Sequence, residues 1–105
     1  MTAVREALAA SMSEKDLLAK VRTLARLLGW TTYHTHRSDH SEAGFPDLVM
    51  VKGSRLLFVE LKSEKGRTSP AQEDWWRKLR LAGQEYQLWR CHHWLDGTID
   101  EELRR

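Results

Sequence analysis

Two acidic residues and a lysine border a pair of apolar runs near the middle of the sequence. Asp47 directly precedes Leu48–Val51, and Glu60 and Lys62 follow Leu56–Val59. A hard divalent cation such as magnesium prefers oxygen ligands and commonly binds through one or two carboxylates together with a substrate phosphate. Acidic residues that continue a buried strand are costly unless they are paired or ligate a metal. These residue types therefore indicate a metal site that acts on a phosphate ester.

The two apolar runs predict a β-hairpin. Both are rich in β-forming residues, and Gly53-Ser54 between them suits a two-residue turn. With that turn, the register places Asp47 directly opposite Glu60. Opposed residues have Cβ atoms about 4.5–5.5 Å apart, so two like charges there destabilise the sheet unless a cation lies between them. Side chains alternate along a strand, so Glu60 and Lys62 share one face and converge with Asp47.

Each of these three residues also has an ordinary structural explanation. Asp47 follows a proline and fits a turn or a cap. Lys62 fits the polar end of an edge strand, whereas beside a metal its ammonium would hold an attacking water or stabilise charge developing on the phosphate. Whether Lys62 also accepts a proton is left open. Glu60 is the hardest to explain structurally, because it continues an apolar strand without a break.

Two predicted helices lie before and after the hairpin. Residues 13–28 carry apolar side chains at three- and four-residue spacings, and Gly29 is a natural C-terminal stop. Ser69-Pro70-Ala71-Gln72 is typical of a helix start, with a serine cap, a proline in the first turn and a glutamine three residues after the serine. This second helix is expected to end at Gly83. The residues it is expected to turn toward the sheet are Trp75, Trp76, Leu79 and Ala82.

The remaining segments complete a small mixed sheet. Residues 30–36 and 86–91 read as further strands, and residues 92–105 as a tail with one short helix. The predicted fold class is therefore α/β (α+β), a mixed β-sheet flanked by helices. Residues 1–12 are assigned to an N-terminal arm, which is a short helix, a frayed end or a dimer arm. Residues 13–105 form the single domain.

Glu14 and Gln72 are candidates to join the site from the two helices. Helical spacing puts Glu14 on the face of Leu17 and Val21, where its carboxylate would reach the metal directly or through water. As a first-turn acid it also complements the helix dipole, and Ser11-x-x-Glu14 fits a capping box. Gln72 likewise fits the capping box that begins at Ser69.

The order of these motifs resembles a known family. An acidic helix, then Gly44-Phe45-Pro46-Asp47, Glu60-Leu61-Lys62 and Ser69-x-x-Gln72, is similar to the VRR-NUC nucleases of the PD-(D/E)xK superfamily, in their stand-alone phage and bacterial form. The resemblance runs from about residue 13 to residue 90 and implies a restriction-endonuclease-like core. The Val-Arg-Arg tripeptide of the family name is absent, and Leu88-Trp89-Arg90 is expected to occupy the equivalent strand.

The resemblance implies a magnesium-dependent endodeoxyribonuclease, with manganese as a substitute. The implied metal ligands are Asp47, Glu60, the backbone carbonyl of Leu61, and Glu14. The implied catalytic set is Asp47, Glu60, Lys62, Gln72 and Glu14, with the glutamine positioning the lysine or the water. The resemblance further implies a homodimer that resolves four-way (Holliday) junctions, since two symmetric cuts need two sites.

Two alternatives stay open at this point. One is a repair- or restriction-type nuclease of the same fold that cuts flaps or other branched DNA. The other is a nuclease-like module that binds DNA without cleaving it, although such a module is expected to have lost Asp47, Glu60 or Lys62, and all three are present.

Composition sets wider bounds. With 105 residues, 41% of them hydrophobic and 30% charged, the chain has room for one modest core. No apolar run approaches the ~20 residues of a membrane span, and no secretory signal is recognisable. The one cysteine, Cys91, is expected to be a small buried residue in a reducing compartment, the cytoplasm of a bacterium or of a phage-infected cell.

The net charge, the histidines and the tryptophans say less about function. The net charge of +2 is weak support for a nucleic-acid partner. The basic residues that follow the hairpin could contact a DNA backbone, and they are Lys62, Lys65, Arg67, Arg77, Lys78 and Arg80. A zinc site at His34, His36 and His40 is rejected because the strand and the polar loop 37–43 do not give ligand spacing. DNA contact by His36, Arg37 or His40 is a further expectation. The five tryptophans are expected mostly in the core, and the alternative for Trp75 or Trp76 is stacking on an unpaired base.

Overall fold

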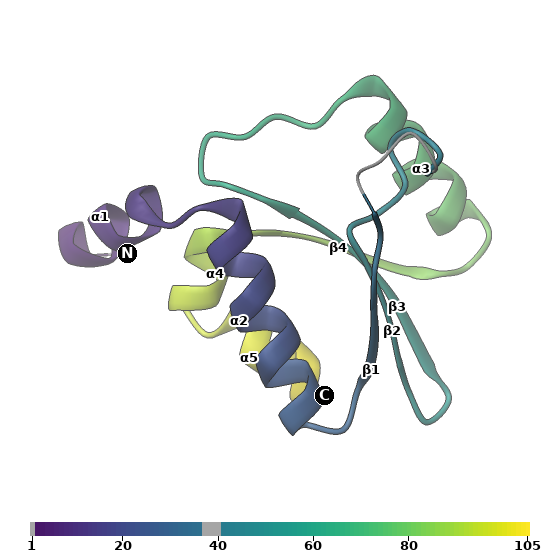
Figure 1. Cartoon of the computed structure of the whole chain (residues 1–105), viewed down its shortest axis with the longest axis horizontal. Helices are drawn as coiled ribbons and strands as arrows, with labels where there is room; N and C mark the ends of the chain where they lie inside the picture. The colour runs from purple at the N-terminus through teal and green to yellow at the C-terminus, as the bar shows by residue number, and fades with distance from the viewer. Residues whose placement is uncertain (1, 37–40) are drawn as a thin grey trace.

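The computed structural model describes residues 2–36 and 41–105. The expected DNA contacts of Arg37 and His40, and positions 37–40 of the polar loop, lie outside these residues. A single sheet forms the centre of the molecule, with helices on both of its sides (Figure 1).

The predicted hairpin forms with the predicted register. β2 (Leu48–Lys52) and β3 (Arg55–Lys62) pair antiparallel around Gly53-Ser54, with Lys52 opposite Arg55. Gly53 adopts a φ of +60°, a conformation that glycine reaches without a steric penalty. Leu48 lies opposite Val59 at the far end of the ladder, so the next position in this register is Asp47 opposite Glu60.

The hairpin is completed by one strand on each side. β1 (Thr31–His34) pairs antiparallel with β2, and β4 (Glu85–Arg90) pairs parallel with β3, which gives the strand order β1-β2-β3-β4. The parallel pair is joined through α3 (Pro70–Leu81), as a parallel connection requires. The sheet is therefore mixed, as expected.

β3 extends beyond β2 by three residues. Glu60, Leu61 and Lys62 pair only with β4, where their partners run from Leu88 to Arg90. β2 begins at Leu48, and Pro46, two residues earlier and opposite Leu61 in this register, has no N–H to donate to a longer ladder. At this end of the sheet, the edge of β3 that faces β2 therefore lacks a complete set of backbone hydrogen bonds.

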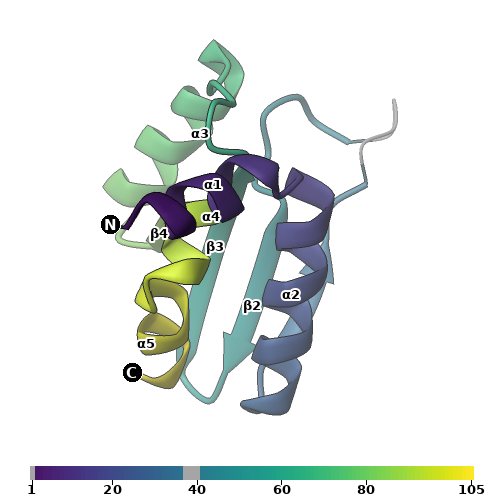
Figure 2. The same ribbon diagram turned by 90° about the vertical axis from the view of Figure 1, so that its left-hand side faces the viewer.

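Four helices cover one face of the sheet. α1 (Ala3–Ser11), α2 (Glu14–Leu27), α4 (Cys91–Leu95) and α5 (Thr98–Arg104) lie on the side that faces the viewer in Figure 2. The core lies between them and the sheet. Its buried residues are Ala9, Leu17, Val21, Ala25, Trp30, Leu48, Met50, Leu57, Val59, Leu61, Trp89, Cys91, Ile99 and Leu103.

The C-terminal segment differs from the prediction of a tail with one short helix. It forms two helices, and Ile99 and Leu103 of α5 are fully buried. The indole N–H of Trp30 donates to the Leu103 carbonyl at 3.0 Å, and Arg55 at the hairpin donates to the Glu102 carbonyl at 2.7 Å. Helices this short gain most of their stability from packing, which a local sequence pattern does not report.

Two predictions of burial were also wrong. α3 buries none of its residues, and Trp76 and Ala82 are exposed, although the Trp76 ring does lie toward the sheet, against Tyr86 of β4. The face of the sheet beneath α3 carries Glu60 and Lys62 at its end, so α3 has a polar end of the sheet to cover rather than an apolar core.

Among the described residues, no helix is long and apolar enough to cross a bilayer.

Candidate active site

Asp47 is fixed at the end of the sheet by a backbone hydrogen bond. Its Oδ2 accepts from the N–H of Leu61 at 2.8 Å. In the hairpin register Leu61 would pair with Pro46, whose carbonyl instead accepts from the Thr35 hydroxyl at 2.7 Å. The Asp47 carboxylate therefore takes the place of a missing ladder acceptor, and this bond sets its position beside Glu60.

Glu60 is a buried carboxyl with one unsatisfied oxygen. It is only 1% exposed. Its Oε2 accepts from the Gln72 side-chain amide at 2.7 Å and lies 3.6 Å from the Lys62 ammonium, whereas its Oε1 has no hydrogen-bond partner among the described residues. Burial, reinforced by the negative charge of Asp47 and opposed by Lys62, raises the pKa of the Glu60 carboxyl from 4.5 to about 8.

Lys62 is buried at the end of β3, and the loop that follows it is held from β4. Its register partner, Arg90, donates to the carbonyls of Ser63 at 2.9 Å and Gly66 at 2.6 Å. These bonds hold the loop on both sides of its turn. The backbone at Lys62 is therefore fixed, and so is the direction in which the aliphatic part of its side chain leaves the strand. Its ammonium faces the carboxylate of Glu60 rather than bulk solvent.

Gln72 serves both the helix and the site. Its side-chain Oε1 accepts from the Ser69 backbone N–H at 2.8 Å, and its backbone N–H donates to the Ser69 hydroxyl oxygen at 3.2 Å. These two bonds complete the predicted capping box. The side-chain amide nitrogen remains available and donates to Glu60. The capping role expected of Gln72 is therefore confirmed, and its amide meets Glu60, while the positioning of Lys62 or of a water stays a prediction.

Glu14 lines the walls of the site. It is the first residue of α2, and the capping box there is formed by Ser13 and Asp16, so the proposed box from Ser11 to Glu14 was wrong. Glu14 and Asp47 together line two cavities of about 430 and 370 Å³. The smaller of these is also lined by Lys62 and Gln72.

The carboxyl groups fit a divalent cation that completes its shell with waters. Within residues 2–36 and 41–105, no group of three or more His, Cys, Asp or Glu side chains is arranged to hold a metal. Magnesium does not require one, because it keeps several waters and binds through one or two carboxylates. The unsatisfied Oε1 of Glu60, buried next to a second carboxylate, is the kind of atom that such a cation would satisfy.

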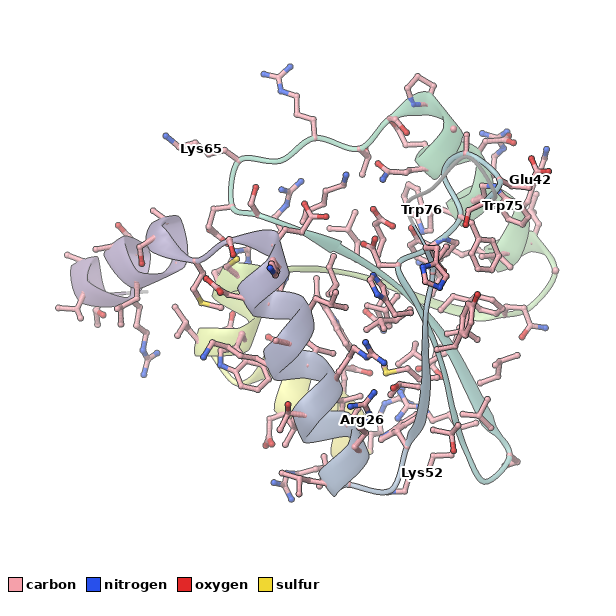
Figure 3. The ribbon with its side chains drawn as sticks, in the orientation of Figure 1. Arg26, Glu42, Lys52, Lys65, Trp75 and Trp76 are labelled. Atoms are coloured by element: carbon pink, nitrogen blue, oxygen red, sulfur yellow. The ribbon has the colours of Figure 1, made fainter. Side chains whose placement is uncertain are left out.

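The loop that carries Asp47 is docked on α3. The ring of Phe45 meets Trp75 and Phe58 edge-on, with centroid separations of 5.0 and 6.2 Å. The Trp75 indole N–H donates to the Ala43 carbonyl at 3.1 Å. Figure 3 labels Trp75 on α3 and Glu42 in this loop, and the two lie on the same side of the molecule.

Gly44 allows the closest part of this contact. It has a φ of +84°, and a Cβ at this position would lie 2.4 Å from the backbone carbon of Ala71 and 2.6 Å from the Gln72 nitrogen. Both obstacles are backbone atoms of the first turn of α3, so they cannot move aside as a flexible side chain would.

Gly44→Ala is therefore expected to lower the free energy of unfolding by about 1–3 kcal/mol, because it adds a backbone clash to an unfavourable φ. The measurement is urea denaturation followed by tryptophan fluorescence. Gly83→Ala is the matched control, since Gly83 also has a positive φ, of +80°, but has no neighbour within 4 Å of its missing Cβ. Equal losses in the two variants would contradict the proposed close approach.

Sequence reasoning missed the residues that support the loop. Trp75 and Phe45 were treated as packing residues or left unassigned, yet together with Gly44 they hold the loop that carries Asp47. The nearest signal was the glycine two residues before Pro46, in a position where a close backbone approach is common. The Arg90 bonds to the loop after Lys62 had no signal in the sequence.

Comparisons with known proteins bear on the family and on the fold. A family model described as "VRR-NUC domain" matches residues 5–93, beginning inside α1. A solved structure titled "VRR_NUC domain" resembles the chain with a TM-score of 0.63 and 21% sequence identity, covering 85% of this chain and 97% of that chain. At this level of identity the structural likeness shows the fold. No curated protein matches the sequence.

Proposed function

The chain belongs to the VRR-NUC domain family, which implies nuclease-type processing of DNA, and from this premise we propose that it is a magnesium-dependent endonuclease. The predicted PD-(D/E)xK arrangement, with Asp47 before β2 and Glu60 and Lys62 at the end of β3, agrees with that membership. The proposed reaction is hydrolysis of a phosphodiester bond by water.

The proposed metal ligands are Asp47, Glu60 and the backbone carbonyl of Leu61, with Glu14 as a further or water-mediated ligand. The carbonyl of Leu61 points to the same strand edge as its N–H, where the register partner is Pro46 and offers no N–H. When bound, a divalent cation supplies Lewis-acid polarisation of the phosphate and lowers the pKa of a water, and manganese provides the same chemistry.

Two residues of the chain act on the reacting groups or position them. The Lys62 ammonium, held beside Glu60, would donate to the attacking water or to a phosphate oxygen and stabilise charge that develops there. Gln72 fixes the rotamer of Glu60 by donating to its Oε2, which leaves Oε1 without a hydrogen-bond partner among the described residues.

The observation that carries this proposal is the buried Glu60 carboxyl, which has an unsatisfied oxygen and lies beside Asp47. The test is incubation of the full chain with a panel of labelled DNAs, namely four-way junction, flap, single strand and duplex, in magnesium, in manganese and in EDTA. Cleavage in either metal and none in EDTA is the expected result. Binding of DNA without cleavage of any panel member would support the non-catalytic alternative.

For the substrate, we propose four-way junctions cut by a homodimer. One chain has one site, and symmetric resolution of a junction needs two cuts, which a two-fold dimer provides. Preferred cleavage of the junction over the flap, together with a dimer mass by light scattering at working concentration, is the expected result. A monomer that cuts flaps faster would assign the protein to the repair-type alternative.

Gln72→Ala is expected to lower the cleavage rate about 10–100-fold, the usual effect of losing a residue that orients a metal ligand. Because the same change removes one half of the capping box, the control is Ser69→Ala, which removes the other half and leaves the amide bond to Glu60 in place. Steady-state cleavage in saturating magnesium measures both. Equal losses in the two variants would assign Gln72 to helix capping alone.

A further inference from the structure

We propose that an unpaired DNA base next to the cleaved phosphodiester stacks on Trp76 of α3. This inference rests on the proposed function, because it places the base relative to a cleavage site. It assigns a further binding site to the side of α3 that carries Gln72, and it makes a base that is unpaired near the branch point part of the bound DNA.

Trp76 is the tryptophan that the fold leaves at the surface. It is 44% exposed, whereas Trp30 and Trp89 are 3% and 1% exposed. Figure 3 labels it on α3. Its ring has a tilted contact with Tyr86 at a centroid separation of 6.4 Å, and Arg80 lies over it at 5.8 Å. An exposed indole therefore has one aromatic neighbour and one mobile cation beside it.

Trp76 lines two cavities. One of about 330 Å³ extends from Gln72 past Trp76 to Tyr86 and Arg90, and another of about 420 Å³ continues toward Arg80 and Leu81. The indole thus lines both cavities, each of which is open to a group that binds against it. Aromatic side chains that stack on bases are the usual means by which proteins bind unpaired nucleotides without regard to sequence.

The position of Trp76 relative to the site defines which nucleotide it would hold. Gln72 donates to Glu60 and lies one helical turn before Trp76 on the same side of α3, and both residues line the same cavity. Four residues of helix advance by about 6 Å. Stacked bases are separated by about 3.4 Å along one strand. A strand whose phosphate is at Glu60 and Lys62 would therefore bring a base to Trp76 within about two nucleotides.

The charge around the groove favours a nucleic-acid strand over a protein partner. Arg80 lies over the ring, and Arg67 is exposed on the loop that leads into α3. The two cavities are lined by one carboxylate, Glu73, and by three cations, Arg77, Arg80 and Arg90, which leaves a positive balance beside Trp76. An apolar body with cationic neighbours matches a base attached to a phosphate backbone.

The test measures DNA binding apart from cleavage. Fluorescence anisotropy of a labelled single-stranded oligonucleotide is followed in the absence of metal, with the full chain carrying Trp76→Ala, Trp76→Phe or Leu27→Ala. Leu27 is the control, because it is an apolar side chain that is 78% exposed and lies at the end of α2. Trp76→Ala is expected to raise Kd about tenfold, Trp76→Phe less than threefold, and Leu27→Ala not at all.

An abasic substitution separates stacking from a structural effect. The oligonucleotides in this series each lack one base. At one position of the missing base, Trp76→Ala is expected no longer to raise Kd, because the base that stacks on Trp76 is already absent. Equal binding by wild type and Trp76→Ala, or an equal loss for every abasic position and for duplex DNA, would overturn the proposal. So would a change in oligomeric state of Trp76→Ala by light scattering, which would assign the surface to a second copy of the chain.

The two proposals fail separately. If wild-type protein cleaves no DNA in magnesium or manganese but Trp76→Ala still weakens single-strand binding at one base position, the endonuclease assignment is wrong and the stacking site stands. If cleavage depends on magnesium but no base position responds to Trp76→Ala, the stacking site is wrong and the nuclease stands.

Discussion

Glu60→Gln is expected to lower the rate of DNA cleavage in magnesium by about 10³-fold or more, because loss of several kcal/mol of transition-state stabilisation has this effect on a rate. The substitution keeps the shape of the side chain, and the glutamine oxygen can still accept from Gln72. What it removes is the negative charge that a cation needs. The measurement is single-turnover cleavage of the preferred member of the DNA panel.

Asp47→Asn is expected to have a similar effect for the same reason, since its remaining carbonyl oxygen can still accept from the Leu61 N–H. Glu101→Gln is the control, because Glu101 is an exposed carboxylate on α5, and it should cleave within about twofold of wild type, as surface changes usually do. Circular dichroism of each variant establishes that the fold is intact. A Glu60→Gln protein that cleaves at the wild-type rate would remove this residue from the active site.

Without metal, ionisation of Glu60 is expected to lower the free energy of unfolding as pH rises. Its pKa is raised in the folded protein, from 4.5 to about 8, so the protonated form is favoured by folding. The stabilisation is fully present below pH 4.5 and is lost as pH rises toward 8, by on the order of a few kcal/mol. Glu60→Gln, which is neutral at every pH, should unfold at a higher denaturant concentration than wild type at pH 8 and at a similar one at pH 4.5.

Glu64 provides a control of opposite sign. Burial raises the pKa of its carboxyl, but hydrogen bonds from the His92 backbone and ring outweigh this and hold the pKa below 4.5. Its stabilisation is therefore present above pH 4.5 and lost in acid, so Glu64→Gln should destabilise the protein at pH 8. If both variants shift stability in the same direction at pH 8, the environment assigned to Glu60 is wrong.

Magnesium should reverse the penalty at Glu60. A ligand that binds only the folded state stabilises it by mass action, by about 2.7 kcal/mol at one hundred times its Kd. Thermal unfolding at pH 8 is therefore expected to shift upward with magnesium in the wild type and much less in Glu60→Gln. An equal shift in the two proteins would place the bound cation elsewhere.

The central hairpin could be predicted from the sequence because its determinants are local. A two-residue turn fixes the register, and alternation along the strands fixes which side chains share a face. The start of α3 was equally local, since Ser69 and Gln72 satisfy each other within one turn. Asp47 and Glu60 could therefore be placed opposite each other from the length of one turn.

The parts that could not be predicted depend on contacts between distant segments. The amide of Gln72 meets Glu60 only because α3 folds back over the end of β3. The burial of Ile99 and Leu103 depends on α5 packing against α4 and α2, while Trp76 is exposed because α3 covers a polar end of the sheet. Local periodicity records which residues are apolar, but not whether another element will cover them.

The hydrogen bond from Leu61 to Asp47 makes one backbone amide a spectroscopic reporter of the site. In most of a sheet an amide proton is protected from exchange by a neighbouring strand, whereas here a functional side chain provides the protection. The exchange rate and chemical shift of this single N–H would therefore follow the position of the Asp47 carboxylate itself. In a protein of this size that resonance could be followed as cation or DNA is added, without a label on either.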